Sequence, residues 1–520
     1  MKFFNTAGPV NPEKHYCVPL ATRLNELELH QLVEQEKYFI LHAPRQTGKT
    51  SAILNFVKEL NKENKYIALY VNVESAQALR GNIEQALPVI IQELKTQAMM
   101  ALPLSDSIFE AFRYLKQEHV PAGSLLTTFF NIWCTNAKKP IILFIDEIDS
   151  LIGDTLISVL RQLRTGYTNR PNAFPQSVCL IGVRDVRDYR IWSDNAQQII
   201  LGGSAFNIKA ESLYLNNFTK AEVQMLYQQH TTETGQKFDT DAIDYAFEMT
   251  NGQPWLVNAL AYEACFKMII DRTKSITKAI FEQAKENLIL RQDTHLDVLI
   301  DRLKEPRVRQ IIDAIINSQE QTPLLNPDDI RYAVDLGLIK KDQATIKIAN
   351  PIYQEIFPRA LATQFQDAMS GNTIDYINTN GLLDMHKLLS KFTDFYRQNS
   401  AIWLEKFDYK ESGPHLILLA FLQRIVNGGG RIHREYALGR GRVDILITWK
   451  TQQIVIELKI LRNKQTIPEG VEQTAQYMDT AHATEGHLVI FDNSSDKSWD
   501  EKIYTKQEKI ENKIITVWGL

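Results

Sequence analysis

The sequence predicts an α/β protein that begins with a parallel β-sheet covered by helices on both faces. Between residues 37 and 215, short apolar runs alternate with longer segments in which apolar residues recur every three or four positions. Continuous apolar runs are typical of buried parallel strands, and the longer periodicity is typical of helices. Strands that alternate with helices imply a parallel sheet with crossovers on both faces. A second, smaller α/β pattern follows after residue 396.

Length and composition indicate a globular protein with several domains. The chain has 520 residues, of which 44% are hydrophobic and 23% charged, and its net charge is −4. Any contact with nucleic acid must therefore come from a local basic patch. The four cysteines are scattered without paired spacing, which favours a reducing compartment over disulfides or structural zinc. No run approaches the length of a membrane span and the N-terminus lacks a signal-peptide pattern, so we expect a cytoplasmic protein without membrane contact.

The first strand, expected over residues 38–41, leads into a loop with the spacing of a phosphate-binding loop. A helical pattern begins directly after the loop, at Ala52. The loop residues are Ala43, Pro44, Arg45, Gln46, Thr47, Gly48, Lys49, Thr50 and Ser51. In such a loop the backbone N–H groups face the phosphates, Lys49 reaches the β- and γ-phosphates, and the Thr50 hydroxyl binds Mg²⁺. Ala43 stands where the pattern GxxxxGK[ST] has glycine, so we expect ordinary backbone geometry there.

Polar residues end two later strands of the predicted sheet. Residues 141–145 are continuously apolar and are followed by Asp146 and Glu147. At the carboxyl end of a strand near a phosphate-binding loop, Asp146 is expected to hold the Mg²⁺ shell and Glu147 to polarise the attacking water. The apolar run 177–183 ends at Arg184, a candidate sensor of the γ-phosphate, although a surface arginine at a strand end is the alternative. The sequence thus predicts a site for ATP and Mg²⁺.

After residue 215 the periodicity is helical as far as residue 290, and it includes the turn Gly252-Gln253-Pro254. Together with Ala43–Thr50 and Ile141–Glu147, this turn resembles the AAA-like ATPases of the STAND kind, which are P-loop switches with a helical lid. The resemblance covers residues 37–260 and implies that Gly252 and Pro254 approach the adenine. Because Ala43 departs from the motif, both hydrolysis and binding without turnover stay open for ATP.

Residues 291–362 have the size and pattern of a winged helix, and a polar helical connector is expected over 363–395. The first of these segments carries a modest basic cluster with Glu305 inside it. The cluster consists of Arg302, Lys304, Arg307 and Arg309. Contact with DNA and a solvated face of a spacer domain are the two interpretations. The second is favoured, since domains of this type often serve packing in STAND-like ATPases.

Two runs with period-two alternation, at residues 443–447 and 454–458, predict paired strands in the C-terminal region. Asp444 lies at the start of the first strand. Glu457 and Lys459 lie two residues apart on the second, so their side chains share one face. Two carboxylates can bind Mg²⁺ or Mn²⁺, and a lysine can stabilise the charge that builds on a scissile phosphate. This constellation predicts metal-dependent cleavage of a phosphodiester.

Gln473 and Tyr477 follow at a spacing of four on a predicted helix, hence on one helix face. Together with Asp444 and the Glu457-x-Lys459 pattern, they resemble the PD-(D/E)xK nuclease superfamily, in its branch with a Gln-xxx-Tyr motif. The resemblance covers roughly residues 400–520. It implies a restriction-nuclease-like domain in which all five side chains act in catalysis. It also implies a glutamate on an upstream helix, for which Glu411 is the candidate and Glu435 the alternative.

Local charge favours nucleic acid as the partner of this region. Between Arg431 and Lys464, eight lysines and arginines stand against three acids. Such an excess is the electrostatic footprint of a phosphate backbone. We therefore predict an ATPase that controls a nuclease acting on nucleic acid, DNA in the first place, with assembly into a homo-oligomer as a further expectation. The alternative is a nucleotide-dependent signalling switch or scaffold whose C-terminal domain binds nucleic acid without cleaving it.

The predicted fold is therefore a P-loop NTPase with a parallel sheet and helical lid, then a winged helix, then a small restriction-nuclease-like α/β domain. The sequence places six segments in order. They are an N-terminal lead-in (1–36), the P-loop ATPase core (37–215), the helical lid (216–290), the winged helix (291–362), the helical connector (363–395) and the nuclease-like domain (396–520).

Overall fold

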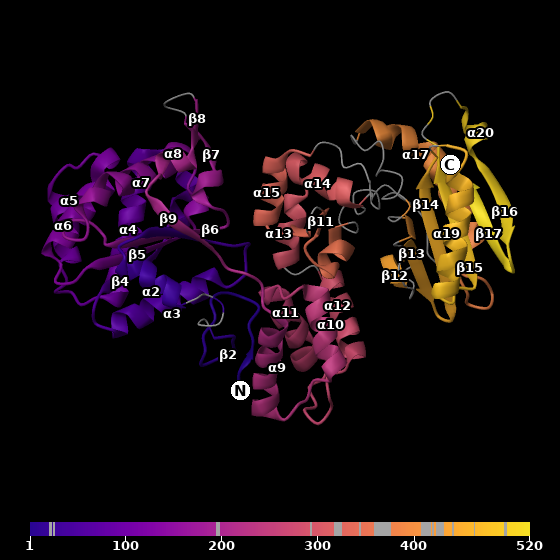
Figure 1. Ribbon diagram of the computed structural model, residues 1–520, viewed down its shortest axis with the longest axis horizontal. Helices are drawn as coiled ribbons and strands as arrows, with labels where there is room; N and C mark the ends of the chain where they lie inside the picture. The colour runs from indigo at the N-terminus through magenta and orange to yellow at the C-terminus, as the bar shows by residue number, and fades with distance from the viewer. Residues whose placement is uncertain are drawn as a thin grey trace. The chain divides into compact units, whose positions relative to one another are not determined.

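The computed structural model of the chain forms two compact units (Figure 1). The first unit comprises residues 1–295 and 327–351, and the second comprises residues 296–326 and 352–520. The structure describes residues 1–19, 23, 26–193, 198–291, 294–316, 325–342, 345–357, 376–406, 418, 421–422, 431–438, 441–461, 463–492, 494 and 497–520. Among these residues, no helix is both long enough and apolar enough to cross a membrane.

A five-stranded parallel sheet organises the first unit, as predicted. Its strands are β3 (Tyr38–His42), β4 (Ile67–Asn72), β5 (Ile141–Asp146), β6 (Ser177–Gly182) and β9 (Lys209–Tyr214). Their order across the sheet is β4-β5-β6-β3-β9. The strand that leads to Arg184 therefore lies between the strand that enters the phosphate-binding loop and the strand that ends in Asp146.

Helices cover both faces of this sheet, because side chains alternate between two apolar clusters along each strand. On β5, Ile142 and Phe144 belong to one cluster, while Leu143 and Ile145 belong to the other. The first cluster is covered by α2 (Glu26–Glu34) and α3 (Lys49–Lys62). The second is covered by α4 (Ile83–Ala101), α5 (Ile108–Gln117), α6 (Leu125–Asn136) and α7 (Gly153–Gly166). Figure 1 shows α2 and α3 on the opposite side of the sheet from α4 and α7.

Short elements that the periodicity did not reveal complete this part of the unit. An antiparallel hairpin follows β6. It comprises β7 (Arg190–Ser193) and β8 (Gln198–Leu201), and the four-residue helix α8 (Gly202–Ala205) comes directly after it. The edge strand β9 begins earlier than the predicted Leu213, because its exposed residues carry no continuous apolar run.

A group of helices follows the sheet, as the helical periodicity predicted. They are α9 (Lys220–Thr234), α10 (Thr240–Thr250), α11 (Pro254–Tyr262) and α12 (Lys278–Arg291), with a π-helical turn (Glu263–Met268) after α11. A capping box between Thr219 and Glu222 begins α9. The N-terminal strands β1 (Phe3–Phe4) and β2 (His15–Tyr16) pair in parallel. The Phe4 ring contacts the rings of Tyr227 and His230 on α9, so the N-terminal lead-in packs on these helices.

The residues predicted to form one winged helix, 291–362, are divided between the two units. The first unit holds α15 (Pro327–Asp335) and the antiparallel pair β10 (Ile339–Asp342) and β11 (Thr345–Ile348). All of α14 (Pro306–Ile316) and most of α13 (Thr294–Arg302) belong to the second unit. The six segment boundaries drawn from the sequence stay predictions.

A mixed six-stranded sheet organises the second unit, with the strand order β12-β13-β14-β15-β17-β16. The strands are β12 (Arg431–Leu438), β13 (Gly441–Trp449), β14 (Gln452–Ile460), β15 (Glu485–Phe491), β16 (Tyr504–Ile510) and β17 (Lys513–Gly519). The pairs β14–β15 and β15–β17 are parallel, and the other neighbours are antiparallel. The paired strands predicted around Lys450 are β13 and β14.

Two long helices flank this sheet. On one face, α19 (Thr466–Thr480) packs its buried Val471 and Met478 against Val455 and Leu488 (Figure 1). On the other face, Tyr396 of α17 (Met385–Lys406) contacts the ring of Phe491. The boundary predicted between residues 395 and 396 falls inside α17, because its amphipathic pattern continues through that point. The short helix α20 (Trp499–Lys502) precedes β16.

Candidate functional site

The phosphate-binding loop closes around the amine of Lys49. Strand β3 ends at His42 and α3 begins at Lys49, with Gly48 in the left-handed conformation at φ 94°. The Lys49 Nζ donates hydrogen bonds to the carbonyl oxygens of Ala43 at 2.7 Å and Pro44 at 2.9 Å. Burial lowers the pKa of this amine. The second left-handed residue of the loop is Gln46 at φ 60°, whereas Ala43 does not adopt that conformation.

The side chains of Thr50 and Asp146 meet across the sheet. The Thr50 hydroxyl donates to Asp146 Oδ2 at 2.7 Å, and the backbone N–H of Glu147 donates to Oδ1 at 2.8 Å. A third donor, the Tyr70 hydroxyl on β4, lies 2.9 Å from Oδ2. A hydroxyl beside a buried carboxylate at a helix N-terminus is a donor set that fits Mg²⁺ with a phosphate. The sequence analysis missed Tyr70, and the only signal was a hydroxyl near the end of an apolar strand.

Glu147 occupies a strained position next to this carboxylate. Its φ of 57° places it in the left-handed region, which is unusual for a glutamate and is often found at functional sites. Burial raises the pKa of its side chain, and the nearby carboxylates of Asp149 and Asp146 act in the same direction. Asp149 in turn accepts a hydrogen bond from the backbone N–H of Val183 at 3.1 Å. The loop after β5 is thereby attached to the end of β6.

Arg184 follows this end of β6, but its guanidinium is engaged by α15. Its Nε lies 3.0 Å from Asp335 Oδ2, and its Cζ lies 4.9 Å from the centre of the Tyr332 ring. The same part of the chain also touches the phosphate-binding loop, since a Cβ at Gly337 would come within 2.7 Å of Pro44. The predicted sensor is therefore held by an acidic partner in this structure, and no sequence pattern marked Asp335.

Gly252 lies where the sheet passes into the helices. Its φ is +69°, and a Cβ there would come within 1.9 Å of the Phe218 carbonyl oxygen, so only glycine fits. Pro254 begins α11, and the Gln253 side chain accepts a hydrogen bond from the backbone N–H of Leu256. The Gly252–Pro254 turn thus contacts the segment that joins the sheet to α9.

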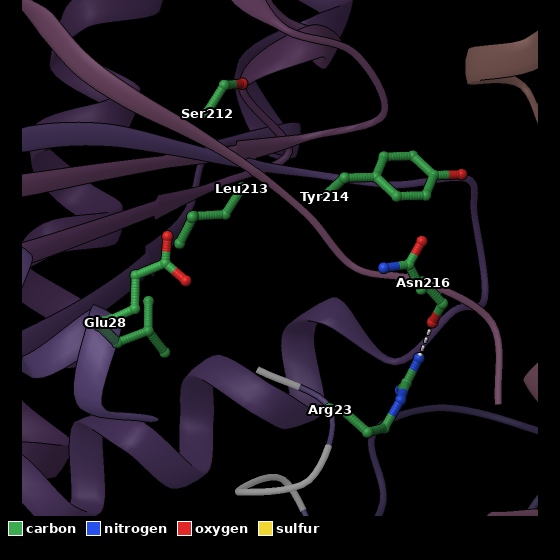
Figure 2. Close-up of a pocket in the computed structure, with 7 residues that line it drawn as sticks. Arg23, Glu28, Ser212, Leu213, Tyr214 and Asn216 are labelled. Atoms are coloured by element: carbon green, nitrogen blue, oxygen red, sulfur yellow. Dashed lines mark hydrogen bonds between the residues drawn. The ribbon is translucent and has the colours of Figure 1, made fainter. Parts of the chain in front are cut away.

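A polar pocket of about 270 Å³ adjoins the phosphate-binding loop (Figure 2). Its lining residues come from the N-terminal region and from β9 and the segment after it: Arg23, Glu28, Leu29, Ser212, Leu213, Tyr214 and Asn216. The Arg23 guanidinium donates to the carbonyl oxygens of Thr47 at 2.7 Å and Asn216 at 2.6 Å. It also lies over the Phe218 ring at 4.7 Å, and burial lowers its pKa to about 10. The sequence analysis missed Arg23, whose role depends on a carbonyl 193 positions away.

In the second unit, Asp444, Glu457 and Lys459 come together beneath α19. The Lys459 Nζ lies 2.9 Å from Glu457 Oε1, and Asp444 Oδ2 accepts a hydrogen bond from the Leu458 backbone N–H at 2.8 Å. Burial and the neighbouring Asp444 carboxylate raise the pKa of Glu457 to about 7. Burial opposes the charge of Lys459, but its pKa is raised by Glu457, with Asp444 and Tyr477 acting in the same direction.

Two polar atoms in this cluster lack a hydrogen-bond partner. They are Glu457 Oε2 and Gln473 Oε1, both buried. An unpaired carboxylate oxygen beside a second acid is the kind of vacancy that a divalent cation satisfies. Within the described residues, no group of three or more His, Cys, Asp or Glu side chains could hold a metal. Glu411 lies outside the described residues, and the alternative Glu435 lies on β12.

The basic cluster near residue 305 is largely neutralised by acids of its own segment. Arg302 and Arg307 both pair with Glu305, at 2.6 and 3.2 Å, and Lys304 pairs with Asp301 at 2.6 Å. These contacts favour the spacer interpretation over contact with DNA.

The sheet order, the loop around Lys49 and the Thr50–Asp146 contact define a P-loop ATPase with one strand between the loop strand and the acidic strand. Residues 15–359 match the model of the AAA-like domain family, so the chain belongs to that family. Residues 385–495 match a domain of unknown function, DUF8371. No curated protein matches the chain.

Several solved structures are similar to the chain at low identity. The Walker-type ATPase PABY2304 of Pyrococcus abyssi is 16% identical with a TM-score of 0.46, over 68% of this chain and 99% of that one. Cdc6p of Pyrobaculum aerophilum is 13% identical with a TM-score of 0.36, over 68% and 96%. The RuvB Holliday junction branch migration motor of Thermotoga maritima is 13% identical with a TM-score of 0.34, over 65% and 92%.

The ion pair between Arg184 and Asp335 generates a prediction about stability. Asp335→Leu should lower the free energy of unfolding by about 3 kcal/mol, because it leaves a half-buried guanidinium without its carboxylate. The double change Arg184→Met with Asp335→Leu should cost clearly less than the sum of the two single changes. Thermal unfolding of the four proteins measures this. Strictly additive losses would show that the two side chains do not stabilise each other.

Proposed function

We propose that the first unit binds and hydrolyses ATP with Mg²⁺, and that this reaction controls a metal-dependent nuclease in residues 396–520 that acts on DNA. The observation that carries the ATPase half is the contact of Thr50 with Asp146, because it joins the phosphate-binding loop to the acidic strand. The observation that carries the nuclease half is the buried Glu457 carboxylate, which lies between Asp444 and Lys459 and has an oxygen without a partner. DNA as substrate and a homo-oligomer as the working form belong to the same proposal.

In the ATPase half, each side chain has one task. The backbone N–H groups at the start of α3 bind the phosphates, and Lys49 exchanges the carbonyls of Ala43 and Pro44 for phosphate oxygens. Thr50 and Asp146 would hold Mg²⁺, which neutralises charge on the β- and γ-phosphates when bound. Glu147 orients a water and accepts its proton, a task that its raised pKa favours.

The rest of the nucleotide extends toward the polar pocket beside the loop. Arg23 connects the carbonyl of Thr47 with that of Asn216, so this pocket is continuous with the phosphate site. The Gly252–Pro254 turn contacts the same junction through Phe218. We therefore assign the ribose and base of ATP to this region, with the helices α9–α12 as the lid.

In the nuclease half, Asp444 and Glu457 would hold the divalent cation, Mg²⁺ or Mn²⁺, which activates water and stabilises charge on the phosphate when bound. Lys459 lies next to Glu457 and would stabilise the charge that develops on the scissile phosphate. Gln473 and Tyr477 project from α19 toward the same cluster and would position the attacked phosphate. The structural support is that these groups share the sheet face that α19 covers.

One observation favours a second function for the whole chain. Arg184 is paired with Asp335 rather than directed to a phosphate, as expected of a switch that binds ATP and holds it. In that case, the second unit would bind nucleic acid without cleaving it, and the chain would act as a nucleotide-dependent scaffold. The two functions differ in whether DNA is cut.

The first prediction concerns binding. Lys49→Ala should abolish ATP binding because it removes the only side-chain charge placed on the phosphates by the loop, while the fold stays intact. Titration calorimetry measures the affinity. Lys58→Ala, which changes an exposed lysine on the same helix, is the matched control and should bind ATP like the wild type. Equal affinity of the wild type and Lys49→Ala would contradict the assignment.

The second prediction separates binding from turnover. Glu147→Gln retains the shape of the side chain but cannot accept the proton of water, so ATP should bind with wild-type affinity and be hydrolysed about 100-fold more slowly. Phosphate release together with calorimetry on the same preparation gives both quantities. Wild-type turnover in the variant would show that Glu147 is only a carboxylate at a strand end.

The third prediction concerns DNA cleavage. Asp444→Ala, Glu457→Ala and Lys459→Ala should each lose cleavage of plasmid DNA in Mg²⁺ or Mn²⁺, yet retain DNA binding, because most basic residues between Arg431 and Lys464 are untouched. The matched control is Glu472→Gln, which removes an exposed carboxylate from α19 beside Gln473 and should cleave normally. Undiminished cleavage in Asp444→Ala and Glu457→Ala would refute the site. Binding without cleavage by the wild type would favour the scaffold function.

A further inference from the structure

The position of Tyr70 relative to the acidic strand follows from the register of the sheet. Strand β4 is the edge strand next to β5, with Tyr70 opposite Phe144 and Asn72 opposite Asp146. Side chains of alternate residues share a face, so Tyr70 lies on the same face as Phe144 and Asp146. This is the face that α3 covers and on which Thr50 begins the helix. A tyrosine is long enough to reach from β4 to a carboxylate two positions further along β5.

The Tyr70 hydroxyl completes a set of three donors around one carboxylate. Thr50 and Tyr70 donate to Oδ2 of Asp146, at 2.7 and 2.9 Å, and the backbone N–H of Glu147 donates to Oδ1 at 2.8 Å. Asp146 is only 1% exposed, so these donors replace the water that would otherwise solvate its charge. Two of them belong to groups with another proposed task, Thr50 with the metal and Glu147 with the water. Tyr70 alone serves only the carboxylate.

We infer that Tyr70 is a positioning residue for the metal site, holding the Asp146 carboxylate in the orientation that receives a divalent cation with ATP. This inference rests on the proposed ATPase function. When the Thr50 hydroxyl turns to the cation, Oδ2 loses one of its two side-chain donors. The Tyr70 hydroxyl keeps its bond and prevents the carboxylate from rotating away from the phosphate-binding loop.

The role predicts a specific pattern in binding rather than a general loss. The Tyr70 hydroxyl does not lie on the phosphate-binding loop, so its removal should leave the affinity for free ATP unchanged. It should weaken only the additional binding that the cation contributes. A purely structural tyrosine would instead lower the thermal stability and affect both forms of ATP alike.

The test is titration calorimetry of the full chain with ATP, once in Mg²⁺ and once in EDTA. Tyr70→Phe should bind ATP about tenfold more weakly in Mg²⁺, the loss expected for one hydrogen bond to a charged group, and bind as the wild type does in EDTA. Tyr66→Phe is the matched control, since it removes a hydroxyl from a buried tyrosine just before the same strand. It should leave both affinities unchanged.

The double variant Tyr70→Phe with Asp146→Asn shows whether Tyr70 acts through the carboxylate. In the Asp146→Asn background, Tyr70→Phe should cause no further loss of affinity in Mg²⁺. An additive loss would overturn the inference, as would an equal loss in Mg²⁺ and EDTA, or no loss at all. A Tyr70→Phe chain that fails to fold would show that the hydroxyl supports the fold instead, and would also overturn it. If the wild type binds no ATP under either condition, the proposed function fails, and the inference fails with it.

Discussion

The hydrogen bond between Thr50 and Asp146 is the contact on which the site of the first unit depends. The two residues are 96 positions apart, and their strands β3 and β5 are separated by β6. They meet because parallel strands bring their carboxyl ends to one edge, where α3 starts. Every element of the sheet contributes to this meeting. The apolar β6 sets the spacing, the loop around Lys49 fixes the start of α3, and Tyr70 and Glu147 fix the carboxylate.

The same edge also collects the elements through which the nucleotide site can influence the rest of the chain. Asp149 attaches the Glu147 loop to the end of β6, and Arg184 continues from there to Asp335 on α15. On the other side, Arg23 joins the phosphate-binding loop to Asn216, close to the Gly252 turn. Both connections consist of charged groups with buried partners. A phosphate at the loop would therefore compete directly with the Asp335 carboxylate for Arg184.

What the sequence revealed and what it concealed have a common physical cause. Buried parallel strands are continuous apolar runs, so four of the five strands of the first sheet and the acids at the end of β5 could be located from the sequence. The edge strand β9 is exposed along much of its length, so only its last residues were found. The same holds for the hairpin β7–β8, which has exposed Ile199 and Leu201 and no alternation long enough to detect.

Residues whose role depends on distant partners were beyond sequence reasoning. Tyr70, Arg23 and Asp335 carry no local motif, and their significance comes from contacts 76, 193 and 151 positions away. In the second unit, by contrast, the pattern of Asp444, Glu457 and Lys459 already specified a shared face. The structure adds the burial of Glu457 and the oxygen that has no partner. Those two features support a cation site more directly than spacing alone.

The central claim is that ATP controls cleavage of DNA by the same chain. The most direct measurement is nicking of supercoiled plasmid by the full chain in Mg²⁺, compared between no nucleotide, ATP and a non-hydrolysable ATP analogue. We predict cleavage that EDTA abolishes and whose rate changes when ATP is added. Cleavage at the same rate under all three conditions would contradict the control by ATP, and no cleavage under any of them would contradict the nuclease.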